Sequence, residues 1–390
     1  MAAEVRPLRL AFFGHGEGRR RDGLSAYSRE LVGALLATGA EVRFFAHEED
    51  GDESPVERAD ALLLRARHFK TVTIPRPGTM ARIRASLAGF APDVVHISWS
   101  FSLHDGTIAR AAHQLGAVCV ATFHVPHGPP GTARGRVMEG LYRYHRTRMH
   151  NVDRCIALST EQRDLLVRAG YPAEQVTIIP NGVNIESISP GPSNVHAELP
   201  ARIVILYIGR LDPEKRVPAL VETFLSLGLP QDHVLCIAGD GIQRDRLRAM
   251  AAPHSNVRVF GLVSAEYALA LLRGCDIFVL PSSAEGLALS LLEAMAAGCA
   301  VVATDAGDDG RALEGVGIVI PTHPLRPALD DALRRLVADA DLRAKLGAAA
   351  RRRAVEMFPM SENAQRVLAV YAAAQSASQH AETRRATLEG

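Results

Sequence analysis

Residues 203–216 read IVILYIGRLDPEKR, a run of apolar residues followed by a glycine and a charged segment. A continuous apolar run of this length, rich in β-branched side chains, is typical of a strand that is buried on both faces of a parallel sheet. We therefore expect a strand over Ile203–Ile208, with a charged loop at its carboxyl end.

Similar apolar runs recur along the chain, and most of them are separated by stretches long enough for a helix, such as Ser25–Thr38 and Arg134–His150. The other expected strands are Leu8–Phe13, Val42–Phe45, Val94–Ile97, Val118–Phe123, Arg154–Leu158, Val176–Ile179, Val234–Ala238, Val257–Phe260, Ile277–Leu280 and Ala300–Ala303. Strands that alternate with helices in this way predict an α/β protein with two Rossmann-like, doubly wound parallel-sheet domains.

The chain has 390 residues, more than the roughly 250 to 300 that one hydrophobic core usually supports. We place an N-terminal domain at 1–190 and a C-terminal domain at 198–360, on either side of a segment rich in Pro, Gly and Ser. We expect residues 361–377 to form a helix that crosses back to the N-terminal domain, and 378–390 to be a disordered tail. Parallel sheets bind ligands beyond the carboxyl ends of their strands, so we expect the active site in a cleft between the two domains.

Composition excludes several classes of protein. Lys plus Arg number 44 and Asp plus Glu 43, so bulk charge does not favour binding to nucleic acid. The five cysteines occur singly, a pattern typical of buried thiols in a reducing compartment. The sequence shows no signal-peptide core and no apolar run long enough to span a membrane. We therefore expect a cytoplasmic protein.

Two loops carry groups suited to phosphate. Gly14-His15-Gly16-Glu17-Gly18 follows the first strand, and its glycines allow backbone amides to approach an anion, although a plain flexible loop remains an alternative. The spacing is not the dinucleotide fingerprint, which argues against a dehydrogenase. Arg210 and Lys215 lie in one strand-exit loop, where a guanidinium and an ammonium can clamp a diphosphate. The alternative is a solvated helix start with Lys215 paired to a nearby acid.

The segment Leu287–Gly298 is apolar almost all round, which predicts a buried helix. Glu293 within it needs hydrogen-bond donors from the protein or a ligand. If Glu285 were also helical, the two carboxylates would lie about 12 Å apart along the axis. This separation suits two parts of an elongated ligand and not a hydrolytic pair. The alternative is one surface glutamate and one structural ion pair.

Four motifs in order now indicate a family. They are Arg210-x4-Lys215, Gly239-Asp240-Gly241, Phe260-Gly261-Leu262-Val263, and Glu285-Gly286-Leu287 continuing to Glu293-Ala294-Met295-Ala296-Ala297-Gly298. This order resembles retaining glycosyltransferase family 4, also called glycosyltransferase group 1, which has the GT-B fold. Weaker similarity in Asp22-Gly23-Leu24, Thr122-Phe123-His124 and Ile179-Pro180-Asn181-Gly182-Val183 extends it over roughly residues 8–375.

The resemblance implies a nucleotide-diphosphate sugar as donor substrate, no further cofactor, and an acceptor bound mainly by the N-terminal domain. It implies catalytic roles for Glu285, Arg210, Lys215 and His124. The donor-binding residues that it implies are Gly23, Gly209, Leu262, Val263, Gly286, Leu287, Ala288, Leu289 and Glu293. In this assignment Arg210 and Lys215 hold the diphosphate, Glu285 contacts the sugar hydroxyls, and Glu293 contacts the ribose.

The same resemblance implies same-face displacement, in which the leaving diphosphate receives the acceptor proton and no protein nucleophile is needed. It also implies no divalent metal, in agreement with the lack of an evident Asp-x-Asp triplet. A metal pair of His124 and His127 is disfavoured, because no carboxylate is close in sequence. The chain departs from the family pattern at Asp22, at Ala288, and at Asp308-Asp309-Gly310-Arg311, where Gly-Gly followed by Glu is common.

Residues 134–148 carry five arginines against Glu139 alone, a local net charge of +4. Val137, Leu141 and Tyr144 share one helical face, which predicts a helix that packs on the core and exposes a basic face. The alternative is binding of an anionic acceptor or lipid headgroups, and thus a peripheral membrane contact.

The function predicted from the sequence is a retaining, metal-independent glycosyltransferase that acts on an unknown hydroxyl acceptor. Two rivals remain: a nucleotide-sugar epimerase on the same fold, and a catalytically inactive nucleotide-sugar-binding protein.

Overall fold

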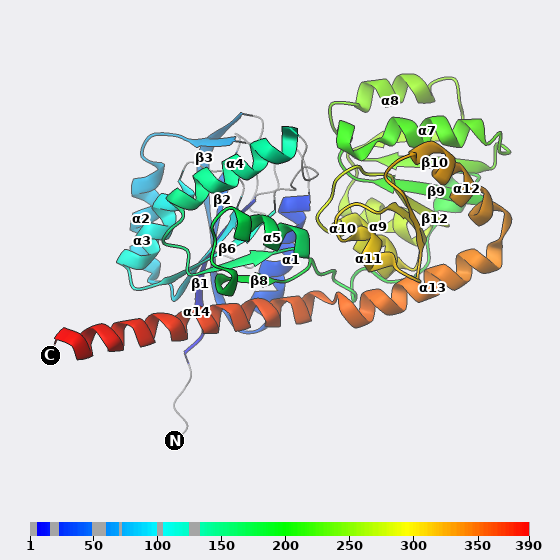
Figure 1. The fold of residues 1–390 in the computed structure, drawn as a ribbon. Coiled ribbons are helices and arrows are strands. Elements are labelled where there is room, and N and C mark those ends of the chain that lie inside the picture. Colours follow the sequence, from blue (N-terminus) through cyan, green and yellow to red (C-terminus); the bar gives the residue numbers. More distant parts are fainter. Residues whose placement is uncertain are drawn as a thin grey trace. The chain divides into compact units, whose positions relative to one another are not determined.

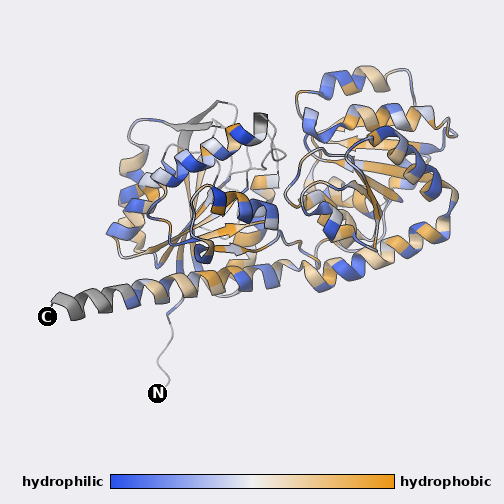
Figure 2. Ribbon diagram, in the orientation of Figure 1, coloured by the Kyte–Doolittle hydropathy of each residue, from blue (hydrophilic) through white to orange (hydrophobic). Residues whose placement is uncertain are grey.

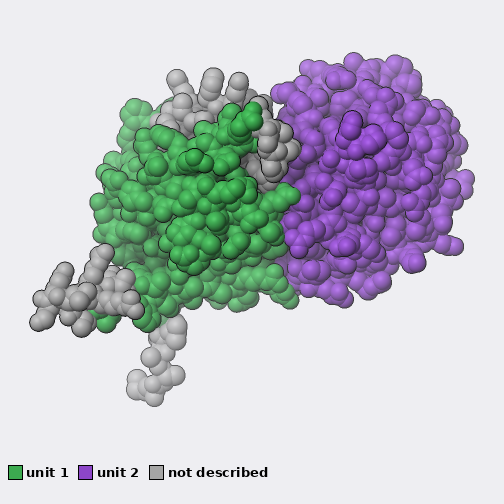
Figure 3. Space-filling model, in the orientation of Figure 1, with its two compact units in different colours: residues 1–180, 361–390 green, residues 181–360 purple. Residues whose placement is uncertain are grey.

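The computed structural model describes residues 6–15, 23–48, 60–69, 72–99, 104–124 and 133–389 (Figure 1). Asp22, His127 and the Gly16-Glu17-Gly18 part of the first glycine loop lie outside these ranges. The chain divides into two compact units, which Figure 3 colours separately. Unit 1 comprises residues 1–180 and 361–390, and unit 2 comprises 181–360.

Unit 1 is built on an eight-stranded sheet with the order β4-β3-β2-β1-β5-β6-β7-β8. Every neighbouring pair is parallel except β3 and β4, which are antiparallel. The side chains of β5 and β6 are all buried, so helices cover both faces at the centre of the sheet. The strands are β1 (Arg9–His15), β2 (Glu41–Glu48), β3 (Asp60–Phe69), β4 (Val72–Pro75), β5 (Val94–Trp99), β6 (Val118–Phe123), β7 (Arg154–Ala157) and β8 (Val176–Ile178).

The helices of unit 1 follow these strands, and the last helix of the chain joins them. They are α1 (Gly23–Ala37), α2 (Thr79–Phe90), α3 (Asp105–Gln114), α4 (Ala133–Arg148), α5 (Thr160–Arg168), the 3-10 turn η1 (Ala173–Gln175), and α14 (Met360–Glu389). Apart from its first residue, α14 belongs to unit 1.

Unit 2 contains a six-stranded, wholly parallel sheet with the order β11-β10-β9-β12-β13-β14. The chain builds this sheet outward in one direction from β9, then returns and continues from β12 on the other side. The strand order therefore reverses between β9 and β12, which is the ligand-binding position in doubly wound sheets. The strands are β9 (Ile203–Ile208), β10 (His233–Ala238), β11 (Val257–Gly261), β12 (Ile277–Leu280), β13 (Ala300–Thr304) and β14 (Ile318–Ile320).

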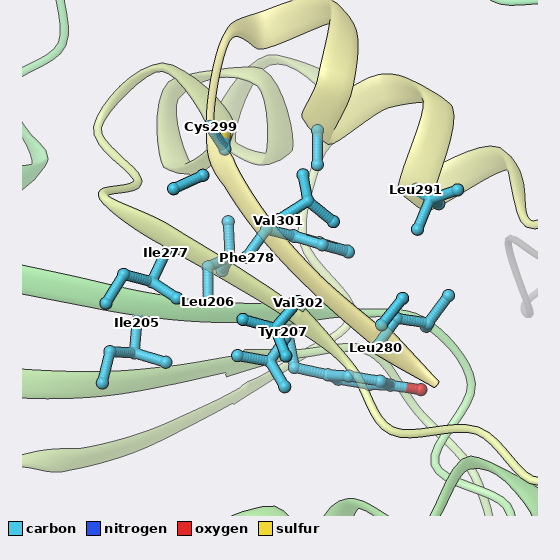
Figure 4. Packing of buried hydrophobic residues seen from close by; sticks show 14 of the residues in the cluster. Ile205, Leu206, Tyr207, Ile277, Phe278, Leu280, Leu291, Cys299, Val301 and Val302 are labelled. Carbon is cyan, nitrogen blue, oxygen red and sulfur yellow. The ribbon is translucent and has the colours of Figure 1, made fainter. Parts of the chain in front are cut away.

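The helices of unit 2 form two groups, one in which α7 packs against α8 and α12, and one in which α10 packs against α9 and α13. In Figure 2 the strands are mainly hydrophobic and the helices carry the hydrophilic residues, and Figure 4 shows side chains of β9, β12 and β13 in the core. The helices are α6 (Val195–Glu198), the 3-10 turn η2 (Pro213–Lys215), α7 (Val217–Ser226), α8 (Arg244–Ala251), α9 (Ala265–Arg273), α10 (Leu289–Ala297), α11 (Asp309–Leu313), α12 (Leu325–Ala338) and α13 (Ala340–Met357).

The predicted fold class is confirmed, because both units are α/β and both sheets are parallel apart from the β3–β4 pair. Three strands were missing from the prediction: β3, β4 and β14. The sequence of β3, DALLLRARHF, contains charged residues that interrupt its apolar run, and β14 has only three residues. Neither gives the long apolar run used to recognise the other strands.

Two boundaries also differ from those predicted. The units divide at Pro180, ten residues before the boundary placed at 190, because the segment from Asn181 onward belongs to unit 2. Helix α14 continues to Glu389 across the stretch predicted to be disordered. Residues 378–389 contain no glycine or proline and are rich in good helix formers, so an existing helix extends through them at little cost.

Candidate active site

The loops after β9 and β12 meet where the strand order of unit 2 reverses. Residues 209–216 leave β9, and residues 281–288 leave β12. The two loops are joined directly, because the Ser283 N–H donates to the Glu214 carbonyl oxygen at 2.7 Å. This junction brings together two charged motifs that are 70 residues apart in sequence.

Glycines allow the β9 loop to lie against the turn after β10. A Cβ atom added at Gly239, whose φ is +141°, would stand 1.9 Å from the Gly209 carbonyl oxygen. A Cβ atom at Gly241 would stand 2.6 Å from the Leu211 backbone. The Leu211 N–H also donates to the Asp240 carbonyl oxygen at 2.8 Å. The Gly239-Asp240-Gly241 motif therefore fixes the position of the β9 loop, and its glycines are required sterically.

Lys215 and Glu285 form an ion pair across the two loops. Lys215 Nζ donates to Glu285 Oε1, and the side chains are only 14% and 11% exposed. Pairing of Lys215 with an acid was one of the two alternatives for this loop, and the acid is the glutamate predicted to contact the sugar. Screening by water is limited at this exposure, so the pair is stronger than an ordinary surface ion pair.

Arg210 lies at the outer edge of the same site. Its guanidinium contacts the carboxylates of Asp212 and Glu214, the second at 3.0 Å, and its side chain is 44% exposed. These are local pairs of the kind expected for a solvated loop. They also keep the guanidinium in the β9 loop, with much of its surface accessible to an anion.

Tyr207 supports the backbone at Arg210, although the sequence did not indicate this role. Its ring is fully buried and its hydroxyl donates to the Arg210 carbonyl oxygen at 2.7 Å. Burial, with a smaller contribution from the Glu285 carboxylate, raises the pKa of Tyr207 well above its ordinary value. The hydroxyl is therefore a stable donor. A tyrosine at the end of an apolar strand signals core packing, so the sequence offers no way to recognise this contact.

Helix α10 begins at Leu289, later than predicted, so Glu285 lies in the turn before the helix. The helical separation calculated for Glu285 and Glu293 therefore does not apply. Most of α10 is buried as expected, but Glu293 is partly exposed and has partners within the protein. Ala288 precedes the helix and supplies no side-chain cap.

Two residues outside the predicted site hold this turn through hydrogen bonds. The Asn181 side-chain amide donates to the Leu287 carbonyl oxygen at 2.7 Å. Asp309 Oδ1 accepts from the Ala288 N–H at 2.8 Å. Asn181 was visible only as part of the Ile179–Val183 motif, and Asp309 only as a departure from the family pattern.

Leu262 and Val263 follow β11 in the same unit, and Leu262 is 44% exposed. An exposed leucine beside a strand end provides an apolar surface of the kind that a base can pack on. Gly23 is in unit 1, where it is the exposed first residue of α1.

His124 also belongs to unit 1 and follows β6, next to a chain of buried polar contacts. The Tyr371 hydroxyl lies 2.6 Å from Nδ1 of His96, and the Thr122 hydroxyl lies 3.0 Å from its Nε2. Tyr27 is within 3.5 Å of Thr122 and packs edge-on against His124, with ring centroids 4.4 Å apart. These contacts link α14 to β6, the strand directly before His124.

Burial sets the charge of both histidines. It lowers the pKa of His96 to about 3 and holds the pKa of His124 well below its ordinary value, with a smaller effect of His15 and His96 on His124. Both rings are therefore neutral near pH 7. A neutral imidazole can donate one hydrogen bond and accept another.

Helix α4 differs from its prediction. Val137, Leu141 and Tyr144 were expected to pack on the core, but they are 62%, 41% and 60% exposed. The buried residues are instead Tyr142, at 0%, and His145, at 8%. The helix therefore presents an apolar stripe together with its basic residues, and Arg136 and Arg143 line a shallow hollow on it.

Within the described ranges, no three side chains of His, Cys, Asp and Glu converge as a metal site would require. No helix in the described part of the chain is both long and apolar enough to cross a membrane.

Comparison with known proteins identifies the class. Residues 21–187 match the sequence model of Glycosyltransferase Family 4, and residues 193–353 match that of Glycosyl transferases group 1. The two matches lie in order and span most of the chain. The protein belongs to this family of glycosyltransferases, as the motifs predicted.

Two relatives and one solved structure illustrate the similarity. A GDP-mannose-dependent alpha-mannosyltransferase of Mycolicibacterium smegmatis is 29% identical over 341 residues, which cover 83% of this chain and 86% of the relative. A D-inositol 3-phosphate glycosyltransferase of Kineococcus radiotolerans is 26% identical over an alignment of 410 positions, gaps included, and the alignment covers 90% of each chain. The structure of Anabaena HepE in complex with UDP and glucose matches with a TM-score of 0.76 at 16% identity, and covers 94% of this chain and 100% of HepE.

Proposed function

We propose that this glycosyltransferase is retaining and metal-independent, and that its donor is a nucleotide-diphosphate sugar bound by the loops after β9 and β12. The observation that carries the proposal is the Lys215–Glu285 pair at the strand-order reversal of unit 2, with Arg210 in the same loop. A cation next to a carboxylate matches the two ends of such a donor, the anionic diphosphate and the hydroxyl-rich sugar.

The ion pairs of the free enzyme exchange partners when the donor binds. Phosphate oxygens replace the Asp212 and Glu214 carboxylates on Arg210, at low cost because that side chain is 44% exposed. Lys215 turns from Glu285 to the diphosphate, which releases the Glu285 oxygens to accept from sugar hydroxyls. Glu293 binds the ribose, and Leu262 and Val263 border the base.

The reaction exchanges one bond at the sugar C1 atom for another. The bond between C1 and the diphosphate oxygen breaks, and the acceptor oxygen bonds to C1 on the same face. The acceptor proton passes to the departing phosphate oxygen. Arg210 and Lys215 stabilise the charge that develops on that phosphate, which is the role otherwise served by a metal ion.

The two donors to test first are GDP-mannose, which is named for a relative, and UDP-glucose, which is named for a structural neighbour. We expect one of them to yield nucleoside diphosphate and a glycoside whose anomeric configuration, read by NMR, equals that of the donor. Turnover should persist in EDTA. An inverted product or loss of turnover in EDTA would contradict the mechanism.

Glu285→Ala tests the site itself. We expect it to abolish transfer while the protein keeps its fold, with a lower melting midpoint because Lys215 loses its partner, whereas Glu266→Ala, at an exposed position of α9, leaves both transfer and the midpoint unchanged. Full turnover by a natively folded Glu285→Ala would refute the assignment. Conversion of the donor in the absence of any acceptor would instead indicate the epimerase.

On the acceptor side, we propose that α4 contacts an anionic membrane surface. Its exposed apolar stripe Val137, Leu141 and Tyr144 lies on the same helix as five arginines and a single glutamate, a combination that suits the boundary between headgroups and acyl chains. The arginines add attraction to negatively charged lipids.

Vesicle sedimentation tests the contact. We expect the protein to sediment with vesicles that contain phosphatidylglycerol and not with pure phosphatidylcholine, and Val137→Ser combined with Leu141→Ser to release it. Ile242→Ser, which changes a 76%-exposed residue of unit 2, is the matched control and should not. Equal sedimentation of all variants would exclude α4 as the contact.

A further inference from the structure

Asp309 is the first residue of α11 and is completely buried. In the part of the chain that the structure describes, Asp105 is the only other buried acidic side chain. A buried carboxylate is stable only if several donors satisfy its oxygens. The hydrogen bonds of Asp309 therefore decide its state.

Those hydrogen bonds are too few for a charged group. Oδ1 accepts from the Ala288 N–H at 2.8 Å, and no described residue hydrogen-bonds Oδ2. The neighbouring charges are the Glu285 and Asp308 carboxylates, which oppose ionisation, and the Lys215 ammonium, which favours it. Lys215 is already paired with Glu285, so a charged Asp309 would leave a net negative charge in the interior.

The backbone just before Asp309 lies close against the turn that carries Glu285. A Cβ atom added at Gly307, whose φ is +60°, would stand 2.4 Å from the Glu285 and Gly286 carbonyl oxygens. The Asp308 N–H donates to the Gly286 carbonyl oxygen at 2.7 Å. The start of α11 is therefore packed directly on the turn that carries Glu285.

We propose that Asp309 is protonated in the folded enzyme and acts as a positioning residue for the turn between Glu285 and α10. It holds the Ala288 amide, and by remaining neutral it adds no negative charge at the helix N-terminus, where a charge would repel the donor diphosphate. The diphosphate part of this inference rests on the proposed function. Burial, followed by the Glu285 charge, raises the pKa of Asp309 well above its ordinary value, in agreement with a neutral acid.

A measurement without ligand tests the protonation. In protein labelled with 13C-carboxyl aspartate, the infrared spectrum at pH 8 should show a protonated carboxyl band that is lost in Asp309→Asn and kept in Asp308→Asn. If Asp309→Asn does not fold, a band that persists in Asp105→Asn still decides, because Asp105 is the only other buried aspartate in the described residues and exposed aspartates are ionised at this pH. Absence of the band overturns the proposal.

Binding tests the positioning role. Among UDP, GDP, ADP and TDP, the tightest ligand should bind wild type more weakly as pH rises through the ionisation of Asp309, by up to tenfold per pH unit. Asp309→Asn, which keeps an oxygen acceptor but cannot ionise, should bind like wild type at pH 7 and lose this alkaline dependence. Asp309→Leu, which removes the acceptor, should bind weakly at every pH.

The outcomes distinguish the proposal about Asp309 from the proposal of a nucleotide-sugar donor. A carboxyl band with no binding of any nucleotide would refute the donor assignment and leave the protonation of Asp309 standing. Nucleotide binding with the same alkaline dependence in wild type and Asp309→Asn would overturn the positioning role and leave the donor site intact.

Discussion

Replacing Lys215 with methionine separates the stability of the site from its function. The change keeps most of the side-chain volume and removes the only cation shown to pair with Glu285 in the described residues. With both partners less than 15% exposed, we expect Lys215→Met to lower the free energy of unfolding by about 2 to 4 kcal/mol, between the values for exposed and buried pairs. Lys215→Met with Glu285→Gln should recover much of this loss, because no isolated charge remains.

Nucleotide binding should follow a different pattern. Losing one charge-assisted contact of about 1.5 to 3 kcal/mol weakens diphosphate binding by about 10- to 150-fold. We expect this loss in the single and the double variant, and no change for the free nucleoside. Calorimetric titration with both ligands measures it, and Arg334→Gln, which breaks an exposed pair with Asp330 in α12, is the control. Wild-type diphosphate affinity in Lys215→Met would refute the role of Lys215.

Three further predictions concern other parts of the chain. Arg210→Gln should also weaken binding of the diphosphate but not of the nucleoside, by about tenfold because this side chain is the more exposed of the two cations; equal loss for both ligands would contradict its role. Because burial lowers the pKa of His96 to about 3, the unfolded chain binds the extra proton, and unit 1 should lose up to about 1.4 kcal/mol per pH unit as pH falls from 6.5 towards 3. His96→Gln should lessen this slope in urea unfolding followed by the fluorescence of Trp99, the single tryptophan; an unchanged slope would show that His96 is not its source. Gly239→Ala should lower the free energy of unfolding by about 1 to 3 kcal/mol, because its Cβ atom would stand 1.9 Å from a carbonyl oxygen. Gly33→Ala is the control, since Gly33 lies in open space on α1 and the change should be neutral or stabilising. A wild-type melting curve for Gly239→Ala would contradict the steric argument.

Much of the fold was predictable because buried parallel strands have continuous apolar sequences. The strands β9 and β12 appeared at their correct places, and so did the charged loops that follow them. The sequence did not show that these two loops meet, because Lys215 and Glu285 come together only through the strand order of the sheet. Local sequence determines a loop's composition, whereas topology determines which loop it meets.

The sequence-based predictions that were wrong or missing also have physical explanations. In α4, both the stripe containing Val137 and Leu141 and the stripe containing Tyr142 and His145 have helical spacing, so periodicity alone could not decide which one is buried. Asp309 was unrecognisable as a site residue because its importance lies in one hydrogen bond to Ala288 and in its burial. Neither property is visible in a sequence.

The assignment of a nucleoside diphosphate site to the loops after β9 and β12 is tested by calorimetric titration with UDP, GDP, ADP and TDP beside their free nucleosides. We predict that one diphosphate binds far more tightly than its nucleoside, and that at 100 times its dissociation constant it stabilises the protein by about 2.7 kcal/mol. If no diphosphate binds more tightly than its nucleoside, the assignment is contradicted.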